Sequence, residues 1–264
     1  MKKLSLTVIM CSLLLAAQSQ DKQEKKNEKR AARKEKINNL IRQAEEGVLV
    51  YRKQTIAGGQ LRTNGYGGFI ELGRMKTNRK TNLYRLDITE TMSQKELKLP
   101  NGAIVFGNPY KYGKVNNFYQ VAFGFGQQHI LGQKGNKNGV AVSAVYTGGL
   151  SLGLLRPYYL EVQNPMGGEN LIIKYSQDTA LFLGTGIVGG GGFSRGWSEM
   201  SVKPGAFVRT ALRFDYGRYN ELVSGLEIGV GVEYYASKIK IMAKQKDKSL
   251  FFQGYIAVLF GRRK

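Results

Sequence analysis

Cysteine and histidine are almost absent from this chain of 264 residues. Cys11 is the only cysteine and lies near the start, and His129 is the only histidine. With so few thiols and imidazoles, the sequence predicts no disulfide framework, no Cys or His metal centre and no catalytic triad that depends on histidine. We therefore predict no cofactor, no metal and no catalytic residue.

Long hydrophobic runs are also missing, apart from residues 4–17. Lys2 and Lys3 precede this run, and Ala17-Gln18-Ser19 places small residues where a signal peptidase reads them. Residues 1–19 are therefore predicted to be a signal peptide that is cleaved after Ser19. The run is too short for a comfortable transmembrane helix, so residence in the inner membrane is not expected.

Acidic residues are scarce, with 19 Asp and Glu against 40 Lys and Arg, a formal net charge of +21. Such a balance usually indicates nucleic-acid binding, because cationic clusters neutralise phosphates. Export argues against nucleic acid as a partner. The polyanions outside the inner membrane include lipopolysaccharide and surface polymers, and a solvated surface without any ligand explains the same charge.

Glycine and proline are both absent from residues 21–46, which carry nine Lys or Arg and six Asp or Glu. The composition predicts a basic helix with a small apolar stripe near its end. Residues 20–46 are thus expected to form a periplasmic extension. This segment is a candidate contact for a periplasmic or secretion-complex protein.

From residue 47 onward the chain is rich in Gly, Tyr and Phe and alternates between apolar and polar residues. We predict an all-β fold over residues 47–264, an antiparallel up-and-down transmembrane β-barrel of about eight strands. The strands are expected at 47–57, 60–76, 83–95, 117–131, 139–155, 204–218, 222–241 and 249–262. A competing topology omits the first of these and takes a strand from 158–183.

The segment 222–242 places two carboxylates, Glu227 and Glu233, on one face of an otherwise apolar strand. Because a charge facing lipid near the midplane costs roughly 2–4 kcal/mol for Lys or Arg and less for an acid, the charged face must line the lumen. A turn near residue 220 places Glu227 across from Arg213 and Glu233 diagonal to Arg209, and these are predicted to be lumenal ion pairs. Further expected lumenal charges are Glu71, Arg85, Asp87 and Asp215. An eight-stranded barrel is filled by its own side chains, so a plugged lumen is expected.

Connections of two lengths alternate along the chain, with long loops predicted at 96–116 and 156–203. Short turns lie in the periplasm and long loops outside in transmembrane barrels, so both termini are expected in the periplasm. One outer loop is rich in lysine. The candidate lipopolysaccharide contacts are Lys238, Lys240, Lys244, Lys246 and Lys248.

The last strand carries regularly spaced apolar residues and ends close to the C-terminus. It resembles the C-terminal strand that the barrel-assembly machinery recognises, although Phe260 is followed by Gly-Arg-Arg-Lys. The candidate assembly-signal residues are Phe252, Tyr255, Ile256, Val258 and Phe260. On these residues and on the strand pattern from 47 to 264, the chain resembles small outer-membrane β-barrel proteins of Gram-negative type. That resemblance implies outer-membrane lipid, lipopolysaccharide and the assembly machinery as partners.

Two further features allow other interpretations. The glycine-rich segment 186–200 lacks the Gly-Lys-Ser/Thr ending of a P-loop and is interpreted as a surface loop, or as a lid on the barrel mouth with Phe193 and Trp197 as anchors. His129 and Ser143 lie on neighbouring predicted strands and could support acyl hydrolysis, since lipid A deacylases are outer-membrane barrels with a Ser and a His that both touch lipid. Here the two residues are at best diagonal to each other, and no orienting acid is identifiable.

The sequence thus predicts an exported protein of the cell outer membrane that is not an enzyme. Its expected role is structural or accessory in the cell envelope, including support of a secretion or surface-attachment complex. The alternatives are a lipid A-modifying barrel enzyme that uses His129, or a narrow channel for small solutes.

Overall fold

The computed structural model describes residues 51–264 except 97, 100–108, 137, 219 and 220. Before residue 51 it describes only Arg30, Ala31, Lys34, Glu35 and Asn38. The predicted signal peptide 1–19, and the extension 20–46 apart from those five residues, lie outside the described part of the chain. Within the described residues, no helix is long and apolar enough to cross a membrane.

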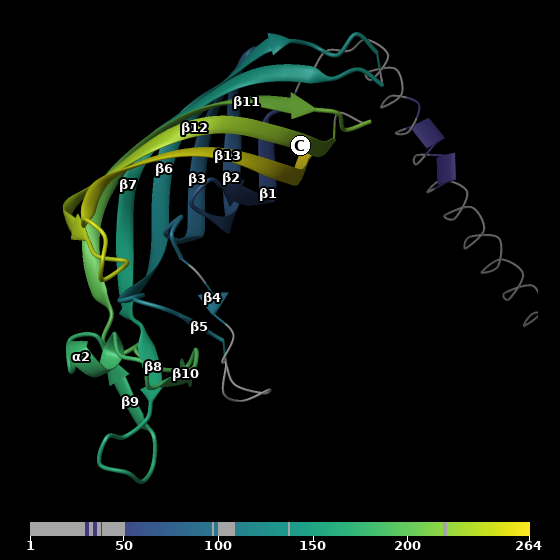
Figure 1. The fold of residues 1–264 in the computed structure, drawn as a ribbon. Helices are drawn as coiled ribbons and strands as arrows, with labels where there is room; N and C mark the ends of the chain where they lie inside the picture. The colour runs from purple at the N-terminus through teal and green to yellow at the C-terminus, as the bar shows by residue number, and fades with distance from the viewer. Residues whose placement is uncertain are drawn as a thin grey trace, which may run out of the picture.

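Eight long antiparallel strands close into a barrel, as the sequence predicted (Figure 1). Each strand pairs with its neighbours in the chain, and the last strand pairs with the first. The barrel strands are β1 (Lys53–Arg62), β2 (Gly65–Thr77), β3 (Lys80–Thr91), β6 (Asn116–Gly132), β7 (Ala141–Pro157), β11 (Ser201–Asp215), β12 (Leu222–Ile239) and β13 (Lys248–Arg263). Closure leaves the wall with no open edge along the paired region.

The first strand differs most from the prediction, since β1 begins at Lys53 and ends at Arg62 rather than covering 47–57. The predicted boundary between the strands 47–57 and 60–76 is wrong, because Gly58 and Gly59 both lie inside β1. Gly58 is there for packing, because a Cβ atom at this position would lie 2.6 Å from the ring of Phe69. The competing topology is wrong, because residues 158–183 contribute nothing to the barrel wall.

The two long loops leave from one end of the barrel, as predicted, and carry small elements of their own (Figure 1). The first loop contains β4 (Lys98–Leu99) and β5 (Tyr110–Lys111). The second, residues 158–200, is called the loop domain here and contains β8 (Tyr159–Val162), β9 (Leu171–Lys174), α2 (Thr179–Phe182) and β10 (Ile187–Gly190). Its strands form a sheet in the order β10-β8-β9. Leu160 and Val162 of β8 pack with Phe182 of α2 in a small buried core.

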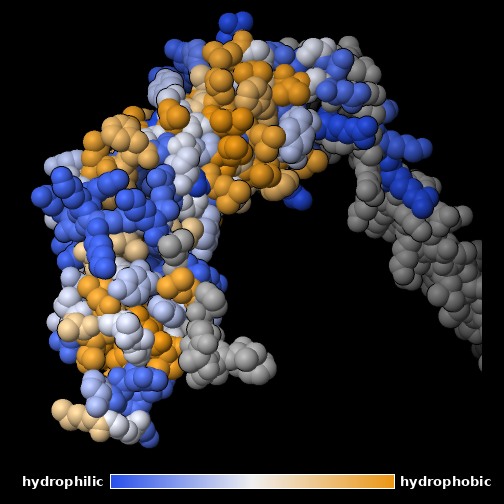
Figure 2. All heavy atoms as spheres, in the orientation of Figure 1, coloured by the Kyte–Doolittle hydropathy of each residue, from blue (hydrophilic) through white to orange (hydrophobic). Residues whose placement is uncertain are grey.

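The barrel wall is apolar on its outer face and polar on its inner face. Along β12, buried and exposed residues alternate, so Glu227 and Glu233 point inward while Ile228, Val230 and Val232 point outward. Figure 2 shows hydrophobic residues gathered over the strands of the visible wall. This distribution is the reverse of a soluble protein, in which charges face water and apolar residues face the core.

Candidate functional site

The lumen of the barrel holds a network of buried ion pairs that joins strands far apart in the sequence. All of the predicted lumenal charges point inward and are at most 4% exposed: Glu71, Arg85, Asp87, Arg209, Arg213, Asp215, Glu227 and Glu233. Because these ions are removed from water, each needs a close partner of opposite charge. The strands position them through simple alternation, since every second residue faces the lumen.

Arg213 on β11 lies at the centre of the network. Its Nη1 and Nη2 atoms each donate to a carboxylate oxygen of Glu71, both at 2.7 Å, in a bidentate pair. Its Nε and Nη2 atoms also donate to Glu227 Oε2 at 2.9 and 2.7 Å. Glu227 stands directly opposite Arg213 in the strand register. A planar guanidinium suits this arrangement, because its fixed fork can serve two carboxylates at once.

Arg85 on β3 continues the network toward the long-loop end. Its Nη1 atom donates to Glu227 Oε1 at 2.8 Å and its Nε atom to Asp87 Oδ1 at 3.1 Å, while its guanidinium lies over the ring of Phe69. Asp87 also accepts from Arg209 Nη1 at 3.0 Å. The chain of contacts thus crosses the lumen and links opposite walls.

Two parts of the network were not apparent in the sequence. Glu233 lies diagonal to Arg209 in the register, but its carboxylate accepts instead from Arg62 Nη1 at 2.9 Å. The sequence prediction assigns residue 62 to the second strand, 60–76, whereas Arg62 is the last residue of β1 and faces the lumen there. At the opposite end of the lumen, Arg263 lies 2.6 Å and Lys134 3.5 Å from Asp215.

Inward-facing glycines make room for large inward-facing rings. A Cβ atom on each of these glycines would lie closer than 3.0 Å to an aromatic ring of the lumen; the pairs are Gly58 with Phe69, Gly124 with Phe207, Gly205 with Tyr235 and Gly229 with Tyr255. Tyr255 also donates from its hydroxyl to Glu227 Oε1 at 2.9 Å. Rings and ion pairs together fill the lumen, which explains why the polar face of the strands is so rich in glycine.

Aromatic residues flank the apolar outer face toward the strand ends. Near the short turns, the rings of Tyr84 and Phe125 lie 5.3 Å apart, and the hydroxyl of Tyr146 donates to Gln127. Near the long loops, Trp197 of the loop domain stacks on Tyr119 at 5.8 Å. Such aromatic rings are typical of the interfaces where a barrel leaves the hydrocarbon.

The glycine-rich segment packs on the outside of the wall. Phe193 and Trp197 lie 5.3 Å apart, and the guanidinium of Arg156 lies over both rings at 4.5 and 4.7 Å. Arg156 Nη1 and Trp197 Nε1 both donate to the carbonyl oxygen of Phe193. These residues anchor the loop domain against Tyr119 on the outer face of β6, and not over the mouth as the lid interpretation would require.

His129 and Ser143 do not form a catalytic pair. His129 pairs with Ala144 in the register and points outward, whereas Ser143 points into the lumen and accepts from Gln128 Nε2 at 3.0 Å. The sheet therefore separates the imidazole from the hydroxyl. Within the described residues, no group of three or more His, Cys, Asp or Glu side chains is placed to hold a metal ion.

A further buried ion pair joins the two ends of the first long loop, Glu96 and Lys114. The ammonium of Lys114, which is fully buried, lies 3.0 Å from both carboxylate oxygens of Glu96, and Lys111 contacts the same carboxylate. Burial lowers the pKa of Lys114 to about 8; the carboxylate of Glu96 opposes this shift and the charge of Lys111 adds to it. Burial favours a higher pKa for Glu96, but the two lysines hold that pKa below its usual range.

The predicted lysines surround the end of the β12–β13 hairpin, where Figure 2 shows a hydrophilic patch. Lys240 and Lys244 lie over the rings of Tyr175 and Tyr112 at 4.7 and 5.6 Å, so both contact the long loops. Lys238, Lys246 and Lys248 are exposed. The hairpin end lies on the same side of the barrel as the long loops.

The predicted assembly-signal residues divide between the two faces of β13. Phe252, Ile256, Val258 and Phe260 are exposed on the outer wall, with Phe252 at 71%. Tyr255 differs, because it is buried in the lumen and bonded to Glu227. The outer face of the last strand is thus a continuous apolar stripe.

A closed eight-stranded barrel with an apolar exterior and an ionised interior is a transmembrane-type β-barrel, the architecture of small outer-membrane β-barrel proteins. No protein-family model matches the chain. No characterised protein matches its sequence either.

Solved structures with a similar arrangement include the attachment invasion locus protein Ail of Yersinia pestis, with a TM-score of 0.39 and 11% sequence identity over 81% of this chain and 100% of that one. Neisserial surface protein A has a TM-score of 0.39 and 10% identity over 80% of this chain and 96% of that one. The N-terminal β-barrel domain of Pseudomonas aeruginosa OprF has a TM-score of 0.35 and 9% identity over 80% of this chain and 98% of that one. Similarity at this level transfers no role, and the barrel class rests on the strand order of this chain.

Proposed function

We propose that this protein is an integral outer-membrane β-barrel without enzymatic activity, which serves as a structural or accessory component of the cell envelope. The observation that carries the proposal is the pairing of an apolar exterior with a lumen closed by buried ion pairs. A barrel built in this way satisfies its backbone groups within the wall and presents an apolar surface to lipid.

The loop domain supports an accessory role in surface attachment. It has its own small core of Leu160, Val162 and Phe182, and it is fixed to the wall by Arg156 and Trp197. A small domain that has its own core and is packed against the wall at the long-loop end is suited to hold a partner. On the predicted orientation this end faces outward, and the extension 20–46 offers a separate contact in the periplasm.

The two alternatives receive less support from the geometry. A deacylase that uses His129 would need a nucleophile on the same face, and Ser143 points to the other side of the sheet. A channel would need an open lumen, whereas Arg85, Arg213 and Glu227 cross it and are at most 1% exposed.

Membrane integration and conductance test the proposal together. The processed protein should remain with outer-membrane vesicles after extraction with alkaline carbonate and urea, and should give no steady single-channel currents in planar bilayers. Extraction into buffer as a folded monomer would refute integration. Regular conductance steps would favour the channel instead, and loss of lipid A acyl chains that depends on His129 would favour the enzyme.

A further inference from the structure

The wall of the barrel has a notch at its long-loop end, because neighbouring strands end at different heights. β1 pairs with β13 only as far as Arg62 opposite Tyr255, and the chain then turns into β2 at residues 63–64. β13 continues past this point to Lys248, still paired with β12 on its other side. Among the residues that the structure describes, its upper part therefore has no strand beside it on the β1 side.

Backbone groups of β13 point toward this notch, above the end of its pairing with β1, and no other described strand pairs with them on that side. Gly254 exchanges hydrogen bonds with Thr63 across the last closed position, from its carbonyl oxygen at 2.9 Å and its amide nitrogen at 3.3 Å. Since backbone groups alternate in direction along a strand, those of Phe252 and Leu250 point the same way, above the end of β1. Unpaired backbone groups are too costly for the hydrocarbon layer, so the notch lies at the level of the lipid headgroups.

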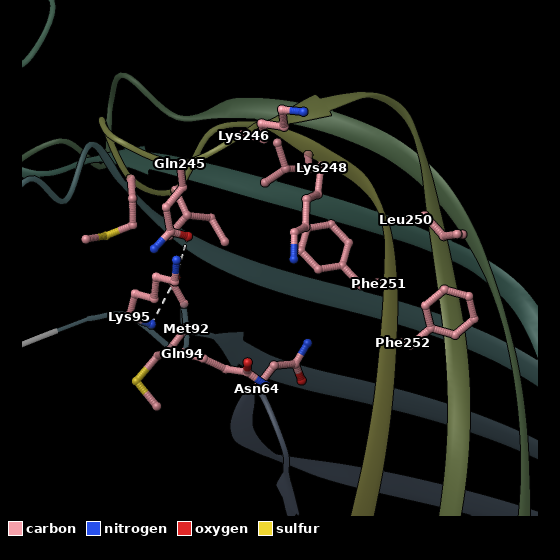
Figure 3. Close-up of a pocket in the computed structure, with 14 residues that line it drawn as sticks. Asn64, Met92, Gln94, Lys95, Gln245, Lys246, Lys248, Leu250, Phe251 and Phe252 are labelled. Atoms are coloured by element: carbon pink, nitrogen blue, oxygen red, sulfur yellow. Dashed lines mark hydrogen bonds between the residues drawn. The ribbon is translucent and has the colours of Figure 1, made fainter.

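The notch is a pocket of about 270 Å³, close to the lower limit of about 300 Å³ for small-ligand sites. Its lower wall is apolar, with Phe251 on the lumen side and Leu250 and Phe252 on the outer side, the last two 42% and 71% exposed (Figure 3). The pocket thus opens sideways toward the membrane as well as upward.

The rim of the notch is cationic. Lys95 lies on the side that follows β3, and Lys246 and Lys248 lie on the side of the β12–β13 hairpin (Figure 3). All three are exposed, and none has an acidic partner within 4.0 Å among the residues that the structure describes. Three ammonium groups around one pocket are suited to phosphate.

Between the lysines, the pocket is lined by neutral hydrogen-bonding groups. Asn64, Gln94 and Gln245 contribute amides, and Ser93 donates from its hydroxyl to Gln245 Oε1 at 2.9 Å. The buried Oδ1 atom of Asn64 has no hydrogen-bond partner among the described residues. A buried acceptor of this kind requires a donor, such as a sugar hydroxyl.

We propose that the notch binds the phosphorylated sugar headgroup of an acylated glycolipid of the lipid A type. Lys95, Lys246 and Lys248 contact phosphate, Asn64 accepts from a sugar hydroxyl, and an acyl chain lies against Phe252 on the outer wall. The inference rests on the proposed function, because it needs the barrel to be in an outer membrane. Of the predicted lipopolysaccharide contacts, Lys246 and Lys248 belong to this site. Lys240 and Lys244 do not, because they lie over tyrosine rings of the long loops.

Native mass spectrometry of the full processed chain in detergent tests the site, with diphosphoryl lipid A and phosphatidylglycerol as probes. The triple variant K95Q/K246Q/K248Q should bind lipid A about tenfold more weakly or worse, since three cationic contacts are lost. The control variant K53Q/K76Q/K80Q, which removes exposed lysines at the short-turn end, should bind within about twofold of the unmodified protein. Asn64→Leu should weaken lipid A binding and leave phosphatidylglycerol unchanged.

Equal lipid A binding by the notch variant and the unmodified protein would overturn the inference, and so would equal binding of the two lipids by the unmodified protein. Circular dichroism and a heat-induced mobility shift check that each variant is folded. The single variant Lys95→Gln, at an exposed loop position, replaces the triple variant if the latter is unfolded. A protein that integrates into vesicles but fails the lipid test refutes the notch alone, whereas failure to integrate refutes the proposed function.

Discussion

Single buried charges are the side chains whose removal this barrel is expected to tolerate least. Glu227 accepts hydrogen bonds from Arg213, Arg85 and Tyr255, which come from three other strands. Removing one member of a buried pair leaves its partner uncompensated, which costs more than the pair itself contributes. Glu227 is therefore the side chain whose charge matters most to the lumen.

Glu227→Gln should lower the free energy of unfolding by about 3 kcal/mol or more, because Arg213 and Arg85 then share one carboxylate fewer. Urea unfolding in detergent micelles measures the change. Glu169→Gln, at an exposed position of the loop domain, is the matched control and should stay within about 0.5 kcal/mol of the unmodified protein. A similar unfolding midpoint for both variants would contradict the role of the network.

Lys114 should lose its proton near pH 8, because burial lowers its pKa to about that value. The pKa of the unfolded loop is the ordinary 10.5, so between about pH 8 and 10.5 the unfolded loop binds more protons and the folded loop gains stability as pH rises. The Cε resonance of Lys114 in a lysine-labelled sample measures the midpoint. In Glu96→Gln the midpoint should fall further, since the carboxylate that favours the charged form is gone; an upward shift would contradict the assignment.

At the scale of strands, glycine residues allow the backbones of neighbouring strands to approach each other closely. A Cβ atom at Gly149 of β7 would lie closer than 3.0 Å to the carbonyl oxygen of Phe123 and to Gly124 Cα on β6. Both contacts are with backbone, which cannot move without breaking the ladder between the two strands.

Gly149→Ala should therefore destabilise the barrel by about 1–3 kcal/mol, the usual cost of overpacking. Gly135→Ala is the control, because nothing lies within 4 Å of a Cβ atom in that turn. Thermal unfolding followed by circular dichroism compares the two. Equal melting temperatures would contradict this prediction, because they would show that β6 and β7 can move apart enough to fit a methyl group without loss of stability.

Strand number, strand order and loop placement could all be predicted from the sequence, because alternation and turn spacing are local signals. The register that places Arg213 opposite Glu227 could also be predicted, because the position of the turn near residue 220 determines it. The partners of Arg209 and Glu233 could not be predicted, because they lie across the lumen on β3 and β1. Contacts of this kind depend on the closed barrel, and no pattern within one strand encodes them.

The notch was also out of reach of sequence reasoning. It depends on the difference in height between the end of β1 and the end of β13, and the first strand was misplaced by several residues. Lys95 comes from a different loop than Lys246 and Lys248, so only the fold brings them to one pocket.

For the whole molecule, the apolar exterior predicts where a charge is not tolerated. Leu150, in the middle of β7, is 73% exposed on the outer wall. Leu150→Arg should lower stability in lipid vesicles by about 2–4 kcal/mol, the cost of arginine near the bilayer midplane. Met166→Arg, at a loop position that is 97% exposed, should have almost no effect. Equal tolerance of both substitutions would show that the wall faces water.

The pairing of β1 with β13 brings Gln54 beside Arg263, and the backbone of Lys53 bonds to that of the terminal Lys264. Among the described strands, the pair that closes the ring is therefore the one most distant in sequence. Folding rates fall as contacting residues become more separated along the chain. The wall of this barrel therefore cannot close before β13 has been synthesised, and a chain that lacks β13 is left with the open edges of β1 and β12.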